Sequence, residues 1–333
     1  VRDVFAQKSP RGLASVAGDG ECSGSEAIAE TGHIGLTPVE DLFLNELGPI
    51  GRFNQSATLE PGGDVTPEDV ERALVRLVAV HDSLRLRVAE AGDGKFGLEV
   101  MEVSGAPEVV LERVALAVGG EAWRREFAAA AEAAVLRLAP ESGRMVSGFW
   151  GSSADGSRLL HLVIHHLAID GVSWRILMDD LATLCSGGEI ERPTGSIVGW
   201  ARYLAREATK PGRAKEVGYW RSVCAGAGDL PLLAVRDGGS AGRGKVLHLS
   251  RSLGRAETDA LLSAPSIYRA EINDILLAAL GLSLAAWREV HGVPAGASVI
   301  GLEGHGREPG SEGPDVTRTL GWFTSLYPVR IDV

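Results

Sequence analysis

Apolar residues recur along the chain with two spacings, one typical of strands and one typical of helices. The clearest helix is predicted over 66–88. Thr66 can cap its start, Pro67 suits the first turn, and two acidic residues follow at the positive end of the helix dipole. Four apolar residues repeat at helical spacing and form its expected buried face: Val70, Leu74, Leu77 and Val78.

The rest of the pattern alternates strands with helices. Strands are expected at 52–60, 95–103, 158–166, 244–253, 297–304 and 320–333. Further helices are expected at 121–138, 172–188, 197–208, 216–224 and 272–290, the last with Asn273 available as its cap. No short-period repeat is present, so this order predicts an α/β fold in two lobes rather than a solenoid.

The two lobes are expected at 35–190 and 191–333. Ahead of them, residues 1–17 have the pattern of a short amphipathic tail, and 18–34 are polar, rich in small residues and typical of a linker.

Composition narrows the function classes. The chain has 333 residues, of which 45% are hydrophobic and 23% charged, as in ordinary globular proteins. A net charge of -11 argues against nucleic acid as the main partner, because phosphate binding needs a basic surface. No apolar run approaches the roughly 18 residues of a membrane span, and no secretory signal is present. We therefore expect a cytoplasmic protein that binds neither nucleic acid nor membrane.

Three cysteines, Cys22, Cys185 and Cys224, are isolated along the chain. No CxxC pair and no cluster of histidine with cysteine indicates a metal site. We expect three reduced thiols and no bound metal.

The stretch IHHLAIDGVSW, 164–174, is the first candidate site. Successive strand residues point to opposite faces, so one of His165 and His166 is expected behind the strand and the other at its end. Asp170 can hold the following loop, cap the next helix or pair with a cation. Gly171 allows close approach of backbone, and Ser173 can cap the helix that carries Trp174. Spacing alone leaves two readings open: a catalytic base, or structural histidines beside a capping aspartate.

A second candidate is GLEGHGREP, 301–309. Glu303 ends a predicted strand beside a glycine loop that holds His305, and burial there raises a carboxyl pKa toward the range useful for acid–base chemistry. The competing interpretation is a solvated loop in which Arg307 pairs with Glu308.

A third stretch, RTLGWFTSLYP at 318–328, contributes three aromatic residues that pattern alone assigns to packing rather than catalysis: Trp322, Phe323 and Tyr327.

Taken together and in this order, HHLAIDGVSWRIL, EGHGRE and RTLGWFTSLYP resemble the epimerization domains of nonribosomal peptide synthetases. These belong to the condensation-domain superfamily, which shares HHxxxDG and a fold like that of chloramphenicol acetyltransferase. HHxxxDG marks the superfamily, whereas EGHGRE and GVSWRIL mark the epimerization branch. GLTPVEDLF at 35–43, RFNQS at 52–56 and HDSLRLRV at 81–88 resemble its earlier landmarks, and residues 1–17 resemble the last helix of a peptidyl carrier domain.

The resemblance implies inversion of the α-carbon of an aminoacyl or peptidyl thioester, in a cleft or tunnel between two lobes. The substrate arrives on the phosphopantetheine arm of an upstream carrier domain in the same polypeptide, and a downstream condensation domain is the next partner. No metal or intrinsically bound cofactor is implied.

His166 and Glu303 are the expected proton-transfer pair. One of them deprotonates and the other reprotonates, or Glu303 acts alone while His166 steadies the enolate. The supporting residues are His165, Asp170, Gly171, Ser173, Trp174, His305 and Arg307. Asp170 is expected to be scaffolding, with Arg307 as its partner.

The family continues beyond the YP segment with a glycine–tyrosine motif and a later segment, neither of which is in this sequence. The carrier-domain motif with its phosphopantetheine serine is not in it either. The second lobe is therefore expected to be incomplete.

Three alternatives remain at this level. The chain can be an amide-forming condensation domain, a catalytically inert docking module, or a coenzyme A-dependent acyltransferase, which shares HxxxD. EGHGRE argues against the first, because condensation needs no second carboxylate.

Overall fold

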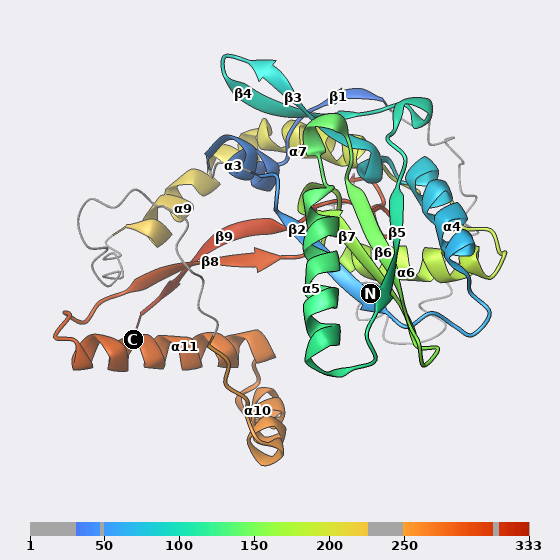
Figure 1. Ribbon diagram of the computed structural model, residues 1–333. Coiled ribbons are helices and arrows are strands. Elements are labelled where there is room, and N and C mark those ends of the chain that lie inside the picture. The colour runs from blue at the N-terminus through green and yellow to red at the C-terminus, as the bar shows by residue number, and fades with distance from the viewer. Residues whose placement is uncertain (1–30, 47–49, 226–248, 309–312, 333) are drawn as a thin grey trace, which may run out of the picture. The chain divides into compact units, whose positions relative to one another are not determined.

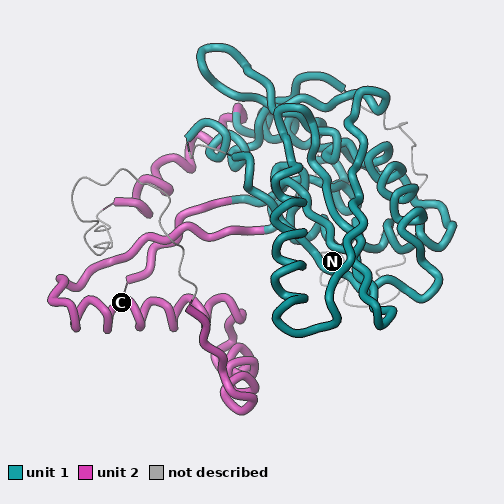
Figure 2. Tube along the Cα trace, in the orientation of Figure 1, with its two compact units in different colours: residues 1–208, 305–325 teal, residues 209–304, 326–333 magenta. Residues whose placement is uncertain are grey.

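The computed structural model describes residues 31–46, 50–225, 249–308 and 313–332. The expected tail at 1–17, most of the linker at 18–34 and Cys22 lie outside these residues. Contacts divide the chain into two compact units, 1–208 with 305–325, and 209–304 with 326–333 (Figure 2). This division differs from the expected lobe boundary after residue 190, because 191–208 and 305–325 group with the first unit.

The first unit is built on a four-stranded sheet. Its strands, in spatial order, are β2 (Asn54–Leu59), β7 (Arg158–His165), β6 (Val146–Ser153) and β5 (Val110–Leu116). β7 pairs antiparallel with both neighbours, and β6 pairs parallel with β5. The apolar pattern indicates β2 and β7 but not β5 or β6.

A smaller antiparallel sheet lies in the same unit. It consists of β1 (Gly32–Ile34), β4 (Lys95–Val100) and β3 (Leu86–Gly92), in that order. The end of the expected linker is therefore a strand, since β1 pairs with β4.

Five α-helices belong to the described part of this unit: α3 (Pro38–Glu46), α4 (Pro67–Val80), α5 (Gly120–Leu136), α6 (Gly171–Cys185) and α7 (Ile197–Ala208). Four 3₁₀ turns accompany them: η1 (Asp82–Arg85), η2 (Val103–Gly105), η3 (Pro140–Ser142) and η4 (His166–Ala168). The predicted helix over 66–88 is too long, because the chain turns at η1 and continues into β3. Its start is as expected: Thr66 and Asp69 form a capping box, with Pro67 in the first turn.

The four-stranded sheet is covered on both faces, with α5 along one of them (Figure 1). Leu160, Leu162 and Ile164 of β7 join the core that also contains buried residues of α4 and α6. The intervening Val163 packs in a second core with Ala134 of α5. A strand buried on both faces has no polar side, which explains the aliphatic run that precedes the two histidines.

The second unit contains α8 (Pro211–Ala214), α9 (Glu216–Cys224), α10 (Arg255–Tyr268), α11 (Ile272–Val290), β8 (Ser298–Gly304) and all but the first residue of β9 (Ser325–Ile331). β8 pairs with β9, and α10 contacts α11. Among the described residues, no single helix is long and apolar enough to cross a membrane, and α10 with α11 satisfies length and composition only as a pair bent by 107°.

Two expectations in this unit are wrong. The cap of α11 is Glu271, in a capping box with Asp274, because Asn273 is already the second residue of the helix. Of the strand expected at 244–253, residues 244–248 lie outside the described part and 249–253 are irregular.

Glu40 is a buried carboxyl in the first turn of α3. Its Oε2 accepts a hydrogen bond from the Thr37 N–H at 2.8 Å. Burial raises the pKa of Glu40 from 4.5 to about 7, against the opposing effect of the Thr37 hydrogen bonds. The folded protein therefore binds more protons than the unfolded chain between these two values.

This sign makes stability fall as pH rises from 4.5 toward 7. We expect Glu40→Gln to remove that slope, so that wild type loses about 2 to 3 kcal/mol more than the variant between pH 5 and pH 8. Denaturant unfolding at both pH values measures the difference. Glu46→Gln, at the exposed end of the same helix, serves as the control and should keep the wild-type slope. Parallel curves for Glu40→Gln and wild type would contradict the assignment.

Candidate active site

His166 stands where the chain leaves β7. It is the first residue of η4, and its N–H donates to the Phe53 carbonyl at 2.9 Å. One residue earlier, His165 is still in register with Asn54 of β2. The end of the sheet therefore brings the two histidines to different environments.

His165 is fully buried, and both ring nitrogens have partners. Its Nδ1 accepts from the Leu167 N–H at 3.3 Å, so Nε2 carries the proton and donates to the Ile50 carbonyl at 2.9 Å. Burial lowers the pKa of His165, which favours the neutral ring. The separation expected from strand alternation is observed, with His165 behind the strand and His166 half-buried at its end.

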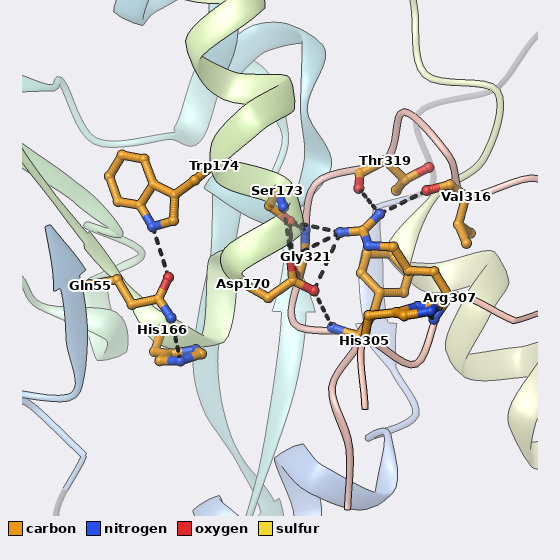
Figure 3. A network of polar contacts seen from close by, with 11 residues as sticks. Gln55, His166, Asp170, Ser173, Trp174, His305, Arg307, Val316, Thr319 and Gly321 are labelled. Atoms are coloured by element: carbon orange, nitrogen blue, oxygen red, sulfur yellow. Dashed lines mark hydrogen bonds and ion pairs between the residues drawn. The ribbon is translucent and has the colours of Figure 1, made fainter. Parts of the chain in front are cut away.

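The ring of His166 packs against two aromatic rings, those of Phe53 and Trp322, which also contact each other with centroids 5.3 Å apart. Phe53 stacks on it with centroids 4.6 Å apart and planes within 8°, and Trp322 lies 4.8 Å away, tilted by 51°. In the ring plane, Nε2 of His166 is 2.8 Å from Nε2 of Gln55. The Gln55 Oε1 accepts from the Trp174 indole N–H at 2.7 Å, which forms the chain of contacts drawn in Figure 3.

Asp170 serves all three roles that its position suggests. It is the N-cap of α6, with Oδ1 accepting from the Ser173 N–H at 2.7 Å. It pairs with Arg307, Nη2 to Oδ1, at 3.2 Å, where the two side chains are only 5% and 6% exposed (Figure 3). Its Oδ2 accepts from the Phe323 N–H at 3.1 Å, which holds the loop. Ser173, expected as a cap, instead lies inside the first turn.

The expected pairing of Asp170 with Arg307 is thus present, and the guanidinium has further partners. Its Nη1 donates to the carbonyls of Val316 at 2.8 Å and Thr319 at 2.6 Å, and its Cζ lies 4.0 Å from the centre of the Phe323 ring. Burial lowers the pKa of Arg307 and Asp170 opposes that shift; an arginine remains charged near neutral pH. Segment 305–325 is therefore tied to the start of α6.

The hydroxyl of Ser173 completes this connection. It accepts from Arg307 Nη2 at 2.8 Å and from the Gly321 N–H at 3.1 Å, and it lies within donor distance of Asp170 Oδ1, 2.8 Å, and the Gly321 carbonyl, 2.9 Å. The hydroxyl has a single proton, so it donates to one of these two oxygens at a time.

The alternative reading of 303–308 fails for Arg307, which pairs with Asp170 rather than Glu308. Glu308 instead lies 3.2 Å from the exposed His305. His305 Nδ1 accepts from the Arg307 N–H at 3.1 Å, so His305 shapes this turn.

The close approach of backbone that is expected at Gly171 is found at Gly306 instead. A Cβ added to Gly171 would meet nothing within 4 Å, so the expected close backbone approach is wrong there. Gly306 has φ +66°, and a Cβ would lie 1.7 Å from the Phe323 carbonyl oxygen. The tight approach of backbone to backbone is therefore at Gly306.

Glu303 lies near the end of β8, in the second unit, and is exposed. The expected burial of this carboxyl is not observed. Trp322 and Phe323 are buried as packing residues should be, whereas Tyr327 on β9 is 38% exposed. Among the described residues, no group of three or more histidine, cysteine, aspartate or glutamate side chains is placed to hold a metal ion.

Sequence reasoning misses the immediate surroundings of His166. From the sequence, RFNQS is only a landmark of the family, yet this segment supplies Phe53 and Gln55. A signal is available: β2 and β7 are apolar-patterned strands, and the first turn of α6 carries Trp174. What the pattern does not provide is their register, Asn54 opposite His165, which brings Gln55 beside the strand end.

This fold and this site define a condensation-type domain. Residues 31–333 match the Condensation domain family model, and the chain belongs to that family.

Particular relatives sharpen the placement. The chain is 34% identical over its full length to part of a linear gramicidin synthase from Brevibacillus parabrevis, and it spans 6% of that relative. The crystal structure of the epimerization domain from the third module of tyrocidine synthetase B is similar with a TM-score of 0.80 and 30% identity, over 92% of this chain and 70% of that one. The condensation domain of Monacolin K polyketide synthase MokA shares the fold, with a TM-score of 0.68, 17% identity, and coverage of 91% and 68%.

These similarities confirm the resemblance to nonribosomal peptide synthetase domains and the expected α/β, two-lobed fold of the chloramphenicol acetyltransferase kind.

Breaking the buried ion pair should be costly. We expect Asp170→Ala and Arg307→Met each to destabilise the protein by about 3 to 5 kcal/mol, because each leaves a buried polar network without one of its charges. The double variant Asp170→Ala/Arg307→Met should cost clearly less than the sum. Denaturant unfolding measures all three, with Glu132→Ala, in the exposed pair with Arg52, as the control. Additive losses would show that the two side chains do not act together.

Gly306→Ala should destabilise the protein far more than Gly156→Ala. Both glycines have positive φ, but an added Cβ at Gly156 meets nothing within 4 Å. Gly156→Ala therefore isolates the backbone cost, about 1 kcal/mol, and the excess at Gly306 reports the collision with Phe323. Equal unfolding free energies for the two variants would contradict the close approach.

Proposed function

We propose that this chain inverts the α-carbon of an aminoacyl or peptidyl group held as a thioester on a peptidyl carrier domain. The observation that carries the proposal is the EGHGRE segment, in which Glu303 lies near the end of β8 and Arg307 is bound to Asp170. Amide-bond formation has no use for this second carboxylate. The similarity to a tyrocidine synthetase epimerization domain supports the same choice.

The reaction demands two things. A proton α to a thioester is weakly acidic, so its removal near neutral pH requires a positioned base and stabilisation of the enolate. Inversion also requires the proton to return on the opposite face. Two groups on opposite sides of the carbon meet both demands without a metal.

His166 and Glu303 fill these roles in the proposal. His166 is half-buried against aromatic rings, which limits access of water to its ring. Glu303 is an exposed carboxylate near the end of β8.

Supply of the substrate is part of the proposal. A thioester on a phosphopantetheine arm needs a carrier domain upstream and a condensation domain that accepts the D-configured product downstream. We place this chemistry in the cytoplasm, with no intrinsic cofactor.

Amide-forming condensation is the competing activity, favoured by the family match and the intact HHxxxDG residues. The two activities separate in one assay. A carrier domain loaded with an L-aminoacyl group, offered without any acceptor, should yield the D form and exchange its α-proton with solvent deuterium. A condensation domain or an inert docking module would do neither.

His166→Ala and Glu303→Gln are each expected to abolish this exchange, a loss of at least about 100-fold for a proton-transfer group. Mass spectrometry of the released amino acid measures deuterium, and chiral chromatography measures inversion. Glu308→Gln, in the same loop, should exchange as wild type does. Wild-type exchange in His166→Ala or Glu303→Gln would remove that residue from the mechanism.

A further inference from the structure

The contacts around Nε2 of His166 determine where its ring carries a proton. We infer that Gln55, oriented by Trp174, keeps Nε2 unprotonated and so makes it the basic atom of this histidine. The tautomer follows from this chain's geometry alone; its use as a base rests on the proposed epimerization. Gln55 and Trp174 are thus positioning residues that act through His166.

Trp174 decides which way the Gln55 amide points. An indole N–H can only donate, so the atom facing it at 2.7 Å has to be the amide oxygen. If the amide were inverted, the NH₂ group of Gln55 would face the N–H of Trp174. Two donors would then be in contact, and the hydrogen bond between the two side chains would be lost. The orientation therefore follows from donor and acceptor chemistry.

Gln55 in turn decides the state of His166. Its NH₂ group is the atom 2.8 Å from Nε2, and an NH₂ group donates. Nε2 is therefore the acceptor, and the proton of the neutral ring resides on Nδ1. A neutral imidazole has one basic lone pair, which here belongs to Nε2.

This arrangement has a consequence for proton transfer. As the bond between the α-carbon and its hydrogen breaks and the N–H bond forms at Nε2, the Gln55 donor has to give way. The N–H at Nε2 of the imidazolium then faces the NH₂ group of Gln55, which is also a donor. The amide cannot turn its oxygen toward the ring without losing its hydrogen bond with Trp174. Two donors face each other in that state, so the proton is returned readily when the reaction runs the other way.

Three titratable residues near His166 have partners of their own. His165, on the same turn, is neutral and bound to Ile50 and Leu167. Asp170 and Arg307 are paired with each other. Phe53, which stacks on the ring, and Trp322, which lies tilted beside it, carry no charge.

The ring nitrogens of His166 can be observed directly by long-range ¹H–¹⁵N correlation NMR of protein labelled with ¹⁵N-histidine. Eight histidines are present, and the His166 signals are identified by their loss in His166→Ala. At pH 7.5 we expect an unprotonated Nε2 and a protonated Nδ1 in wild type. A protonated Nε2 in the neutral ring would overturn the inference.

Three variants test the chain of contacts. Gln55→Glu supplies only acceptor oxygens and should move the proton to Nε2. Gln55→Leu removes the donor and with it the preference for an unprotonated Nε2, so it should give a mixture of tautomers. Trp174→Phe keeps the ring but lets the amide invert, so it should give a mixture of tautomers.

Thr58→Val is the matched control, because it removes a 2.8 Å contact from the same strand to a different histidine, His161. The His166 signals should not change in it. Unchanged His166 signals in Gln55→Glu, with wild-type folding by circular dichroism, would also sink the inference.

The proposed epimerization and the proposed positioning role of Gln55 can be contradicted independently. The expected tautomer without α-proton exchange would contradict the proposed epimerization and leave the positioning role intact. Exchange at the wild-type level in Gln55→Glu, together with a protonated Nε2, would contradict the positioning role and leave epimerization intact. If both proposals hold, the rate of α-proton exchange should fall in Gln55→Glu by about tenfold or more.

Discussion

The buried ion pair between Asp170 and Arg307 is the interaction on which the described site depends. Two charges with so little exposure are stable only when each finds several well-placed partners. Asp170 finds them in the first turn of α6 and in the Phe323 N–H, and Arg307 in two backbone carbonyls. The loop after β7 has little freedom left, and His166 is set by that loop.

The two acidic residues of the motifs, Asp170 and Glu303, have different surroundings. Asp170 has its oxygens occupied by Ser173, Phe323 and Arg307. It supports the histidine through the backbone of the loop, whereas Glu303 is exposed at the end of a strand. Asp170 is therefore a structural residue in this geometry, and the role of Glu303 in proton transfer remains part of the proposal.

Sequence reasoning captures what depends on local pattern. Strands β2 and β7, the capped start of α4 and the separation of His165 from His166 follow from alternation and capping. The pairing of Asp170 with Arg307, 137 positions apart, is expected only once the family resemblance has brought their two motifs together. Sequence reasoning misses β5 and β6, although β6 forms an antiparallel hairpin with β7, and it places the close glycine at Gly171 rather than Gly306. It also misses Gln55, because the partner of a side chain across a sheet depends on register, which local pattern does not reveal.

The ion pair also has a consequence for the order of folding. Asp170 and Arg307 are 137 positions apart, so the N-cap of α6 has to wait for its charged partner during synthesis. At about 5 to 20 residues per second that interval is roughly 10 s. During this interval the Asp170 carboxylate remains hydrated, because Arg307 has not yet been synthesised. The first unit therefore completes its folding only after most of the second has been synthesised, and the site is among the last parts of the domain to form.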